Sequence, residues 1–393
     1  MLQPRIQSVD LLRGIVIFIM ALDHIRDFFH NDSQLFSPED LTKTTAALFF
    51  TRWITHFCAP VFVFLAGTGS YLATRRGMSP AVVSRFLWTR GVWLIVVEMT
   101  FVLFGATFNM SYDFVVWQVI WAIGWSMIVL AALVFVPWRA LLVFSVVMIA
   151  AHNALDGVTS AQFGSVGWMW KVLHERFAAL QLPGGTTAYV LYPLIPWIGV
   201  MTAGFCFGRA FDLPPDSRRR LMLRLGLALT ATFVVVRFVN GYGDPSRWSP
   251  QSSSLMTLLS FLRTSKYPPS LLYLLMTLGP SMIALSVLDR IPAGNRNPLL
   301  VFGRVPLFFY VVHWYVLHLV ALAFARVRYG RIDFMFGLPP ALSPTPAGYP
   351  DGYGYDLLIV YVVWIALVAA MYPLCRWFAR IKATNRSAWL SYL

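Results

Sequence analysis

The stretch VDLLRGIVIFIMALDHIRDFFH, residues 9–30, decides the fold, because it has the length and apolar content of a membrane helix but carries many ionisable side chains. Six of them precede Phe28: Asp10, Arg13, Asp23, His24, Arg26 and Asp27. A charged side chain at the centre of a bilayer costs at least ~2.5 kcal/mol on insertion scales, so such residues face protein or water and usually serve a function. We therefore expect this segment to form one wall of a functional site.

The rest of the chain has the composition of a membrane protein. Of its 393 residues, 58% are hydrophobic and 12% are charged, whereas about a quarter of a soluble domain is charged. Apolar runs of roughly 20 residues recur along the whole length, and only helices satisfy all backbone groups in lipid. The sequence predicts an all-α, polytopic membrane bundle of about ten transmembrane helices, forming a single domain over residues 1–393. The expected spans are 9–29, 50–73, 85–108, 114–136, 138–156, 187–209, 219–240, 269–289, 299–325 and 355–378.

The basic residues predict an orientation in the membrane. Arg218, Arg219 and Arg220 lie between the sixth and seventh spans, and Arg290 and Arg304 lie between the eighth and ninth. Because positive residues favour the cytoplasmic side, both termini should be cytoplasmic, and an even number of spans agrees with this. The formal net charge of +14 is concentrated in such loops and at helix ends. We therefore expect contact with membrane lipids and no binding of nucleic acid.

Cysteine and histidine spacing gives no metal site. Cys58, Cys206 and Cys375 each lie inside an apolar segment and show no paired framework, so we interpret them as small core residues. The five-residue step from His313 to His318 places their side chains about 140° apart on a helix. No bound metal is expected.

Within the first span, residues that carry chemistry share one helix face. A step of about 100° per residue places Asp10, Arg13 and His24 in one stripe, and Asp10 and Arg13 form an i, i+3 pair that can neutralise itself. His24 lies about 16 Å beyond Arg13 along the axis, in the outer half of the bilayer. Because Asp23 and Asp27 flank His24, we expect a carboxylate to fix its imidazole tautomer and raise its basicity, as a general base requires.

Other spans carry polar side chains at comparable depth, namely His56, Glu98 and His313. The simplest arrangement is a polar cavity that opens outward between these spans and the first one. We interpret Glu98 and His313 as substrate-binding residues of this cavity. A single membrane histidine is also often an interhelical hydrogen-bond partner, which is the interpretation we favour for His152 and His318 and leave open for His56 and His313.

Five segments carry a resemblance to a known family. RIQSVDLLRGIVIFIMALDHIRDFF, TRWITHFCAPVFVFLAG, YPLIPWIGVM, KYPPSLLYLLMTLGP and GRVPLFFYVVHWY together resemble, in order and over essentially the whole chain, the bacterial branch of the heparan-alpha-glucosaminide N-acetyltransferase catalytic-domain family. The first span is also similar to membrane acyltransferases that modify bacterial O-antigen and peptidoglycan. Those proteins carry an arginine, ten residues and then a histidine in their first helix, a pattern that falls here on Arg13 and His24.

The resemblance implies a multi-pass acyltransferase of the bacterial cytoplasmic membrane. It would move an acyl group, expected to be acetyl, from cytoplasmic acyl-CoA to a sugar or glycolipid acceptor on the far side. The resemblance further implies that His24 is the catalytic base or a transient acyl acceptor, and that Arg13, with Asp10, belongs to the donor site. Lys266, on the outer side, could bind an anionic glycan. The acetyl-accepting histidine of the heparan branch lies just before or at the second helix, where His30 and His56 are the nearest candidates, so both His24 and His56 remain catalytic candidates.

Two other classes of function stay open. A transporter or flippase would use the same buried charges as a midplane binding site, although we find no internal repeat with matching broken helices to support it. A structural subunit would use the polar groups only to hold helices together. The sequence is compatible with a homo-oligomer as well as with a monomer.

Overall fold

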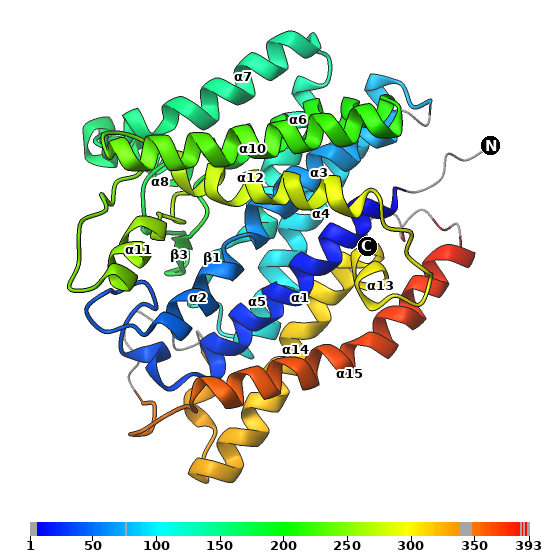
Figure 1. The fold of residues 1–393 in the computed structure, drawn as a ribbon. Helices are drawn as coiled ribbons and strands as arrows, with labels where there is room; N and C mark the ends of the chain where they lie inside the picture. Colours follow the sequence, from blue (N-terminus) through cyan, green and yellow to red (C-terminus); the bar gives the residue numbers. More distant parts are fainter. Residues whose placement is uncertain (1–5, 75–76, 338–347, 386, 388–389, 391–393) are drawn as a thin grey trace.

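The computed structural model describes residues 6–74, 77–337, 348–385, 387 and 390, and it is an all-α bundle with one small sheet (Figure 1). The first eight helices are α1 (Gln7–Phe29), α2 (Ala46–Thr55), α3 (Cys58–Thr74), α4 (Pro80–Val97), α5 (Leu103–Thr107), α6 (Val119–Leu133), α7 (Trp138–Ala151) and α8 (Gly167–Leu173). The remaining helices are α9 (Leu194–Phe207), α10 (Pro215–Val239), α11 (Ser254–Leu262), α12 (Leu271–Leu288), α13 (Pro298–Arg304), α14 (Pro306–Tyr329) and α15 (Leu357–Thr384).

The predicted polytopic membrane bundle is confirmed. Within the described residues, eight helices or joined helix pairs are long and apolar enough to cross a membrane. They are Ala46–Ala73, Pro80–Thr107, Trp138–Leu155, Leu194–Asp212, Pro215–Val239, Leu271–Leu288, Pro306–Tyr329 and Leu357–Thr384. The other two predicted spans fall on α6, which is apolar but shorter, and on α1, which carries the ionisable residues from Asp10 to Asp27.

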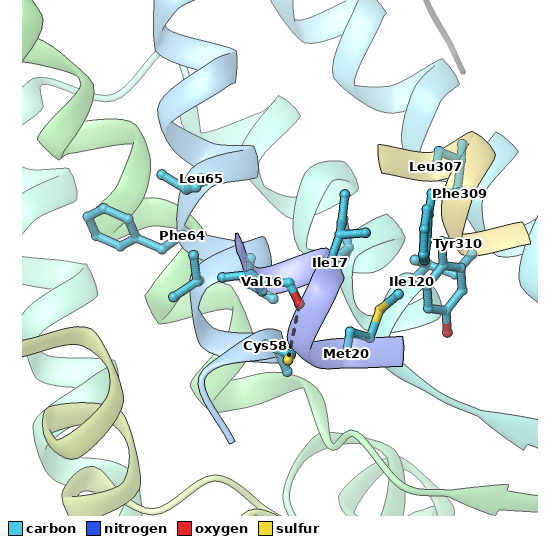
Figure 2. Close-up of a cluster of buried hydrophobic side chains, with 14 of the residues drawn as sticks. Val16, Ile17, Met20, Cys58, Phe64, Leu65, Ile120, Leu307, Phe309 and Tyr310 are labelled. Carbon is cyan, nitrogen blue, oxygen red and sulfur yellow. Dashed lines mark hydrogen bonds between the residues drawn. The ribbon is translucent and has the colours of Figure 1, made fainter. Parts of the chain in front are cut away.

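Helix α1 lies at the centre of the bundle and packs against α2, α3, α12, α13, α14 and α15. Its middle turns are apolar and buried, so they contribute to the hydrophobic core rather than to a lipid-facing surface. Figure 2 shows this core, where side chains of α1, α3, α6 and α14 converge. The residues labelled there are Val16, Ile17, Met20, Cys58, Phe64, Leu65, Ile120, Leu307, Phe309 and Tyr310.

Glycines allow α1 and α13 to cross in direct backbone contact. A Cβ atom at Gly303 would lie 1.8 Å from the carbonyl oxygen of Asp10, and one at Gly14 would lie 1.8 Å from that of Leu299. Small residues at such crossings are a common basis of helix packing in membranes. The crossing holds the first turns of α1, which carry Asp10 and Arg13, against the short helix α13.

The predicted span 299–325 is not a single helix. The chain breaks at Val305, whose φ of −131° and ψ of 50° end α13, and α14 begins at Pro306. Proline lacks a backbone N–H and disfavours the helical conformation in the residue before it, which explains the break. Helix α14 then continues to Tyr329 and ends at Gly330, which has a positive φ.

A three-stranded sheet replaces the beginnings of two predicted spans. Strands β1 (Phe114–Trp117), β2 (Ala178–Gln181) and β3 (Thr187–Val190) lie in the order β1-β3-β2, with β1 parallel and β2 antiparallel to β3. The spans predicted at 114–136 and 187–209 therefore become helical only at Val119 and Leu194. Strands β1 and β3 contain β-branched and aromatic residues, which favour strands. Hydropathy alone did not separate these strands from the helices that follow them.

The two ends of the described chain lie on the same side of the bundle. Ile6, before α1, and Lys382, near the end of α15, line the same cavity. A chain that crosses a membrane an even number of times has both ends on the same side, in agreement with this placement. The cysteines also behave as expected, since Cys58, Cys206 and Cys375 are all free and buried.

Candidate active site

Two cavities lie toward opposite ends of α1. The first, which we call the histidine cavity, has a volume of about 690 Å³, and its wall includes Asp23, His24, Arg26, Asp27, Arg52, Lys266 and Trp314. The second, which we call the arginine cavity, has a volume of about 460 Å³, and its wall includes Asp10, Arg13, Arg90, Arg304, Tyr310 and Lys382. Val119, the first residue of α6, lines both cavities. The residues of the stripe predicted on α1 therefore line two separate cavities: His24 lines the histidine cavity, and Asp10 and Arg13 line the arginine cavity.

His24, in the wall of the histidine cavity, forms a hydrogen bond with His313, which lines neither cavity although we expected it to bind substrate there. The two ring nitrogens, Nδ1 of His24 and Nε2 of His313, are 2.7 Å apart. The other nitrogen of His313, Nδ1, lies 2.5 Å from the carbonyl oxygen of Tyr310 and 3.1 Å from that of Phe309. Because a carbonyl oxygen can only accept, His313 Nδ1 carries a proton, and in the neutral ring Nε2 is then an acceptor.

This arrangement determines the tautomer of His24. If His313 Nε2 accepts, His24 Nδ1 must donate, and His24 Nε2 is left with its lone pair. His24 is only half-buried and borders the cavity, whereas His313 is fully buried. The Trp314 ring stacks on the His24 ring with centroids 4.1 Å apart and holds its plane. The result is an oriented imidazole whose Nε2 is unprotonated, which general-base catalysis needs.

The carboxylates next to His24 in the sequence contact cations instead of its ring. Asp23 accepts two hydrogen bonds from Arg52 Nη1, at 2.7 and 2.6 Å, and lies 3.1 Å from Arg26 Nη2. Lys266 Nζ lies 3.7 Å from Asp23, and Asp27 pairs with Arg26. Neighbouring side chains on a helix point about 100° apart, so Asp23 and His24 face different partners. The structure thus places His313 where we expected a carboxylate.

His56 contacts Glu39 and Tyr273 and not His24. It is fully buried, its Nε2 lies 3.1 Å from Glu39 Oε1, and its ring packs edge-on against Tyr273. Burial raises the pKa of Glu39, but the adjacent His56 imidazole, with Arg52 and Lys266, outweighs this and lowers it to about 2. Glu39 therefore carries a negative charge. His56 lines neither cavity, and the structure does not bring it to His24.

The remaining histidines of the spans hold neighbouring segments together, as expected. The ring of His152 bonds the carbonyl oxygens of Ile149 and Pro269, and the ring of His318 bonds those of Gly105 and Met335. His30 caps the short helix that follows α1, where its Nδ1 accepts from the Asp32 backbone N–H, and it also borders the histidine cavity.

Arg13 and Asp10 form the predicted pair at the other end of α1. Arg13 Nη1 lies 3.5 Å from Asp10 Oδ1, and Arg13 Nη2 donates to the Leu65 carbonyl oxygen at 2.9 Å. The cavity that they line also contains Arg90, Arg304 and Lys382. Of the described residues that line this cavity, four are cations and one is a carboxylate. Such a wall suits a ligand that carries phosphate groups.

Glu98 lines neither cavity. It is buried at the start of a π-helical turn, Glu98–Val102, and the backbone N–H groups of Ile120 and Trp121 hydrogen-bond to its carboxylate. Gln118 gives α6 no side-chain cap, so Glu98 fills that role from a neighbouring helix. Single π-helical turns often occur at functional sites.

Sequence reasoning missed several residues of the two walls. Arg52 stands four residues before His56 and Trp314 directly follows His313, so both lie next to side chains that we had singled out. Arg304 was interpreted only as a signal of orientation in the membrane. Among the described residues, no group of three or more His, Cys, Asp or Glu side chains is arranged to hold a metal ion.

One comparison with known proteins gives a match. A family model described as "Heparan-alpha-glucosaminide N-acetyltransferase, catalytic" matches residues 5–238. The comparison with curated proteins found no match. The matched segment includes Arg13 and His24, whereas His313 and Trp314 come from the part of the chain that follows it.

Proposed function

Because the chain belongs to the family of heparan-alpha-glucosaminide N-acetyltransferase catalytic domains, we propose that it transfers an acetyl group from acetyl-CoA in the arginine cavity to a sugar or glycolipid in the histidine cavity. Family membership and the membrane helices make the chain an integral membrane acetyltransferase that acts on glycans. The observation that carries the finer proposal is the His24–His313 pair, which leaves Nε2 of His24, a residue of the histidine cavity, unprotonated.

The charges of the arginine cavity support acyl-CoA as the donor. Coenzyme A carries several phosphate groups at one end and the thioester at the other. Arg13, Arg90, Arg304 and Lys382 supply positive charge for the phosphate end. The thioester end would extend along α1 toward Val119, which borders both cavities, and so reach His24.

Polar atoms of the histidine cavity support a sugar as the acceptor. Within the described part of the chain, Arg26 Nη1, Ser33 Oγ and Ser265 Oγ are buried without a hydrogen-bond partner, and all three residues line this cavity. Buried polar atoms are normally paired. A sugar offers many hydroxyl groups that can donate and accept, so its binding would satisfy these atoms.

The geometry supports a direct transfer. His24 Nε2 removes the proton of the acceptor hydroxyl or amine while the acceptor oxygen or nitrogen attacks the thioester carbonyl carbon. The tetrahedral intermediate then collapses, the C–S bond breaks, and the protonated His24 returns its proton to the CoA sulfur. A covalent acetyl-His24 intermediate would use the same Nε2 atom as the nucleophile, and it stays an alternative to direct transfer.

We also propose the placement of the chain. Cytoplasmic acyl-CoA requires the arginine cavity to open to the cytoplasm, which puts both termini there in agreement with the positive residues of the loops. The resemblance of the sequence to bacterial proteins supports the bacterial cytoplasmic membrane as its location. One hydrophobic core includes residues from Val9 to Leu390, which supports a single domain over residues 1–393.

Proteoliposomes loaded with a glycan acceptor test the proposal. With labelled acetyl-CoA outside, the protein should release CoA outside and label the acceptor inside. The two cavities at opposite ends of α1 also suit a transporter or flippase. Movement of a solute across the membrane without release of CoA would support that function and contradict acetyl transfer.

A further inference from the structure

Two hydrogen-bond donors of α14 are buried near His24. Within the described residues, neither the Tyr310 hydroxyl oxygen nor the Trp314 indole nitrogen has a partner in full hydrogen-bonding geometry, and the two groups lie next to each other. Both side chains are at least 95% buried. Native structures leave few such groups unpaired, and in a membrane there is no bulk water to pair them.

The two donors lie where the cavities approach each other. Tyr310 lines the arginine cavity and Trp314 lines the histidine cavity. They are four residues apart, so they project from the same face of α14, and their ring centroids are 6.5 Å apart. The His24 ring centroid lies 4.1 Å from that of Trp314 and 6.3 Å from that of Tyr310.

We propose that the Tyr310 hydroxyl and the Trp314 indole N–H form the oxyanion site that binds the thioester carbonyl oxygen. The inference rests on the proposed acetyl transfer. As the acceptor attacks the carbonyl carbon, the C=O double bond becomes a C–O⁻ single bond, and both donors strengthen their hydrogen bonds to that oxygen. When the C–S bond breaks, the double bond returns, so neither donor gains or loses a proton. Donors placed in advance in a dry site stabilise such a charge strongly.

Glu98 contacts the start of α6, where the backbone N–H groups of Ile120 and Trp121 hydrogen-bond to its carboxyl group. The same helix end presents Val119, the residue common to both cavities.

Tyr310→Phe tests the site, with Tyr315→Phe as the matched control. Each variant removes one hydroxyl from α14, but Tyr315 donates to the Phe101 carbonyl oxygen and lines neither cavity. For the purified full-length protein in nanodiscs, we expect Tyr310→Phe to lower kcat by on the order of 10²-fold. The Kd for acetyl-CoA should rise by less than about tenfold, because a hydrogen bond to the neutral carbonyl oxygen is weaker than one to the oxyanion. Tyr315→Phe should leave kcat unchanged. A Tyr310→Phe variant with the wild-type kcat, or one whose only defect is weaker acetyl-CoA binding, would overturn the site.

An infrared measurement follows the carbonyl directly and does not need turnover. The C=O stretch of carbonyl-¹³C acetyl-CoA should shift to lower frequency on binding the wild type, and less so on binding Tyr310→Phe or Trp314→Phe. An equal shift in all three proteins would refute the oxyanion site even if a variant were unstable in turnover assays. A wild type that transfers no acetyl group would refute the proposed function as well, whereas an active wild type with an unaffected Tyr310→Phe would refute the oxyanion site alone.

Discussion

The His24 and His313 rings are hydrogen-bonded to each other at 2.7 Å, although 289 residues separate them in the sequence. The backbone carbonyl groups of α14 fix the proton on His313, and His313 in turn fixes the proton on His24. Neither ring depends on a carboxylate for its orientation. A pair of this kind can take up one proton during catalysis and return it in the next step.

Replacing the two candidate catalytic histidines should have different effects. His24→Ala should lower acetyl transfer by at least about 10²-fold, because it removes the base. His56→Ala should retain transfer but unfold at a lower temperature, because Glu39 then keeps its charge without the imidazole partner. Transfer assays and thermal unfolding of both variants check this. Normal transfer by His24→Ala would exclude His24 as the base.

His313 should act through His24, and two substitutions separate this role from simple packing. His313→Leu leaves the His24 Nδ1–H group without an acceptor, so kcat should fall by about 10²-fold. His313→Gln offers an amide oxygen as a replacement acceptor and should recover part of the lost activity. We would measure kcat and thermal stability for both variants. Equal activity in the two, whatever its level, would contradict the proposed orientation of His24 by His313.

Arg13 should affect the donor and not the acceptor. Arg13→Gln removes a positive charge from the arginine cavity, so the KM for acetyl-CoA should rise by roughly tenfold or more. The KM for the acceptor should stay unchanged. Arg290→Gln is a suitable control because Arg290 is exposed and lines neither cavity. If only the KM for the acceptor rose, the acetyl-CoA site would have to lie outside the arginine cavity.

The contact between Glu39 and His56 should make the stability of the folded protein depend on pH. The pKa of Glu39 is about 2 in the folded chain against an ordinary value of 4.5, so its ionised form stabilises the fold above about pH 4.5. This contribution should decrease as the pH falls from 4.5 and disappear near pH 2. Thermal unfolding of the wild type and of Glu39→Gln should differ most near neutral pH and converge at low pH. A difference that does not change with pH would rule out this contact as its source.

The α1–α13 crossing should not tolerate a side chain. Gly303→Ala places a methyl group against the Asp10 carbonyl group, so the helices must separate at a cost of about 1–3 kcal/mol. Gly294→Ala is the control, because nothing lies within 4 Å of a Cβ atom there. Thermal unfolding in one detergent compares the two. Equal stability would mean that α13 can move without cost.

The sequence predicted the bundle well because apolar length is a strong signal for membrane helices. It did not predict β1 and β3, which are separated from the helices that follow them by only one and three residues, or the break at Val305. In both cases a local backbone preference ended a segment that hydropathy alone would have continued.

Part of the arrangement of the candidate site was predicted. The spacing along α1 placed Arg13 and His24 toward opposite ends of one helix, and they do line two different cavities. The partner of His24 could not be found in the same way, because only the packing of α14 against α1 brings His313 to it. The neighbouring carboxylates suggested a partner through proximity in sequence, but helix geometry turns Asp23 toward Arg52.

The apolar centre of α1 also bears on how well the membrane stays sealed. Val16, Ile17 and Met20 are buried in a continuous core between the turn that carries Arg13 and the turn that carries His24. A hydrated ion would lose its water there and find no polar group to replace it. In the proposed reaction only the slender thioester arm enters this region while the bulk of CoA stays behind. The proposed reaction would thus move acetyl groups across the membrane without a leak of ions that lowers the membrane potential.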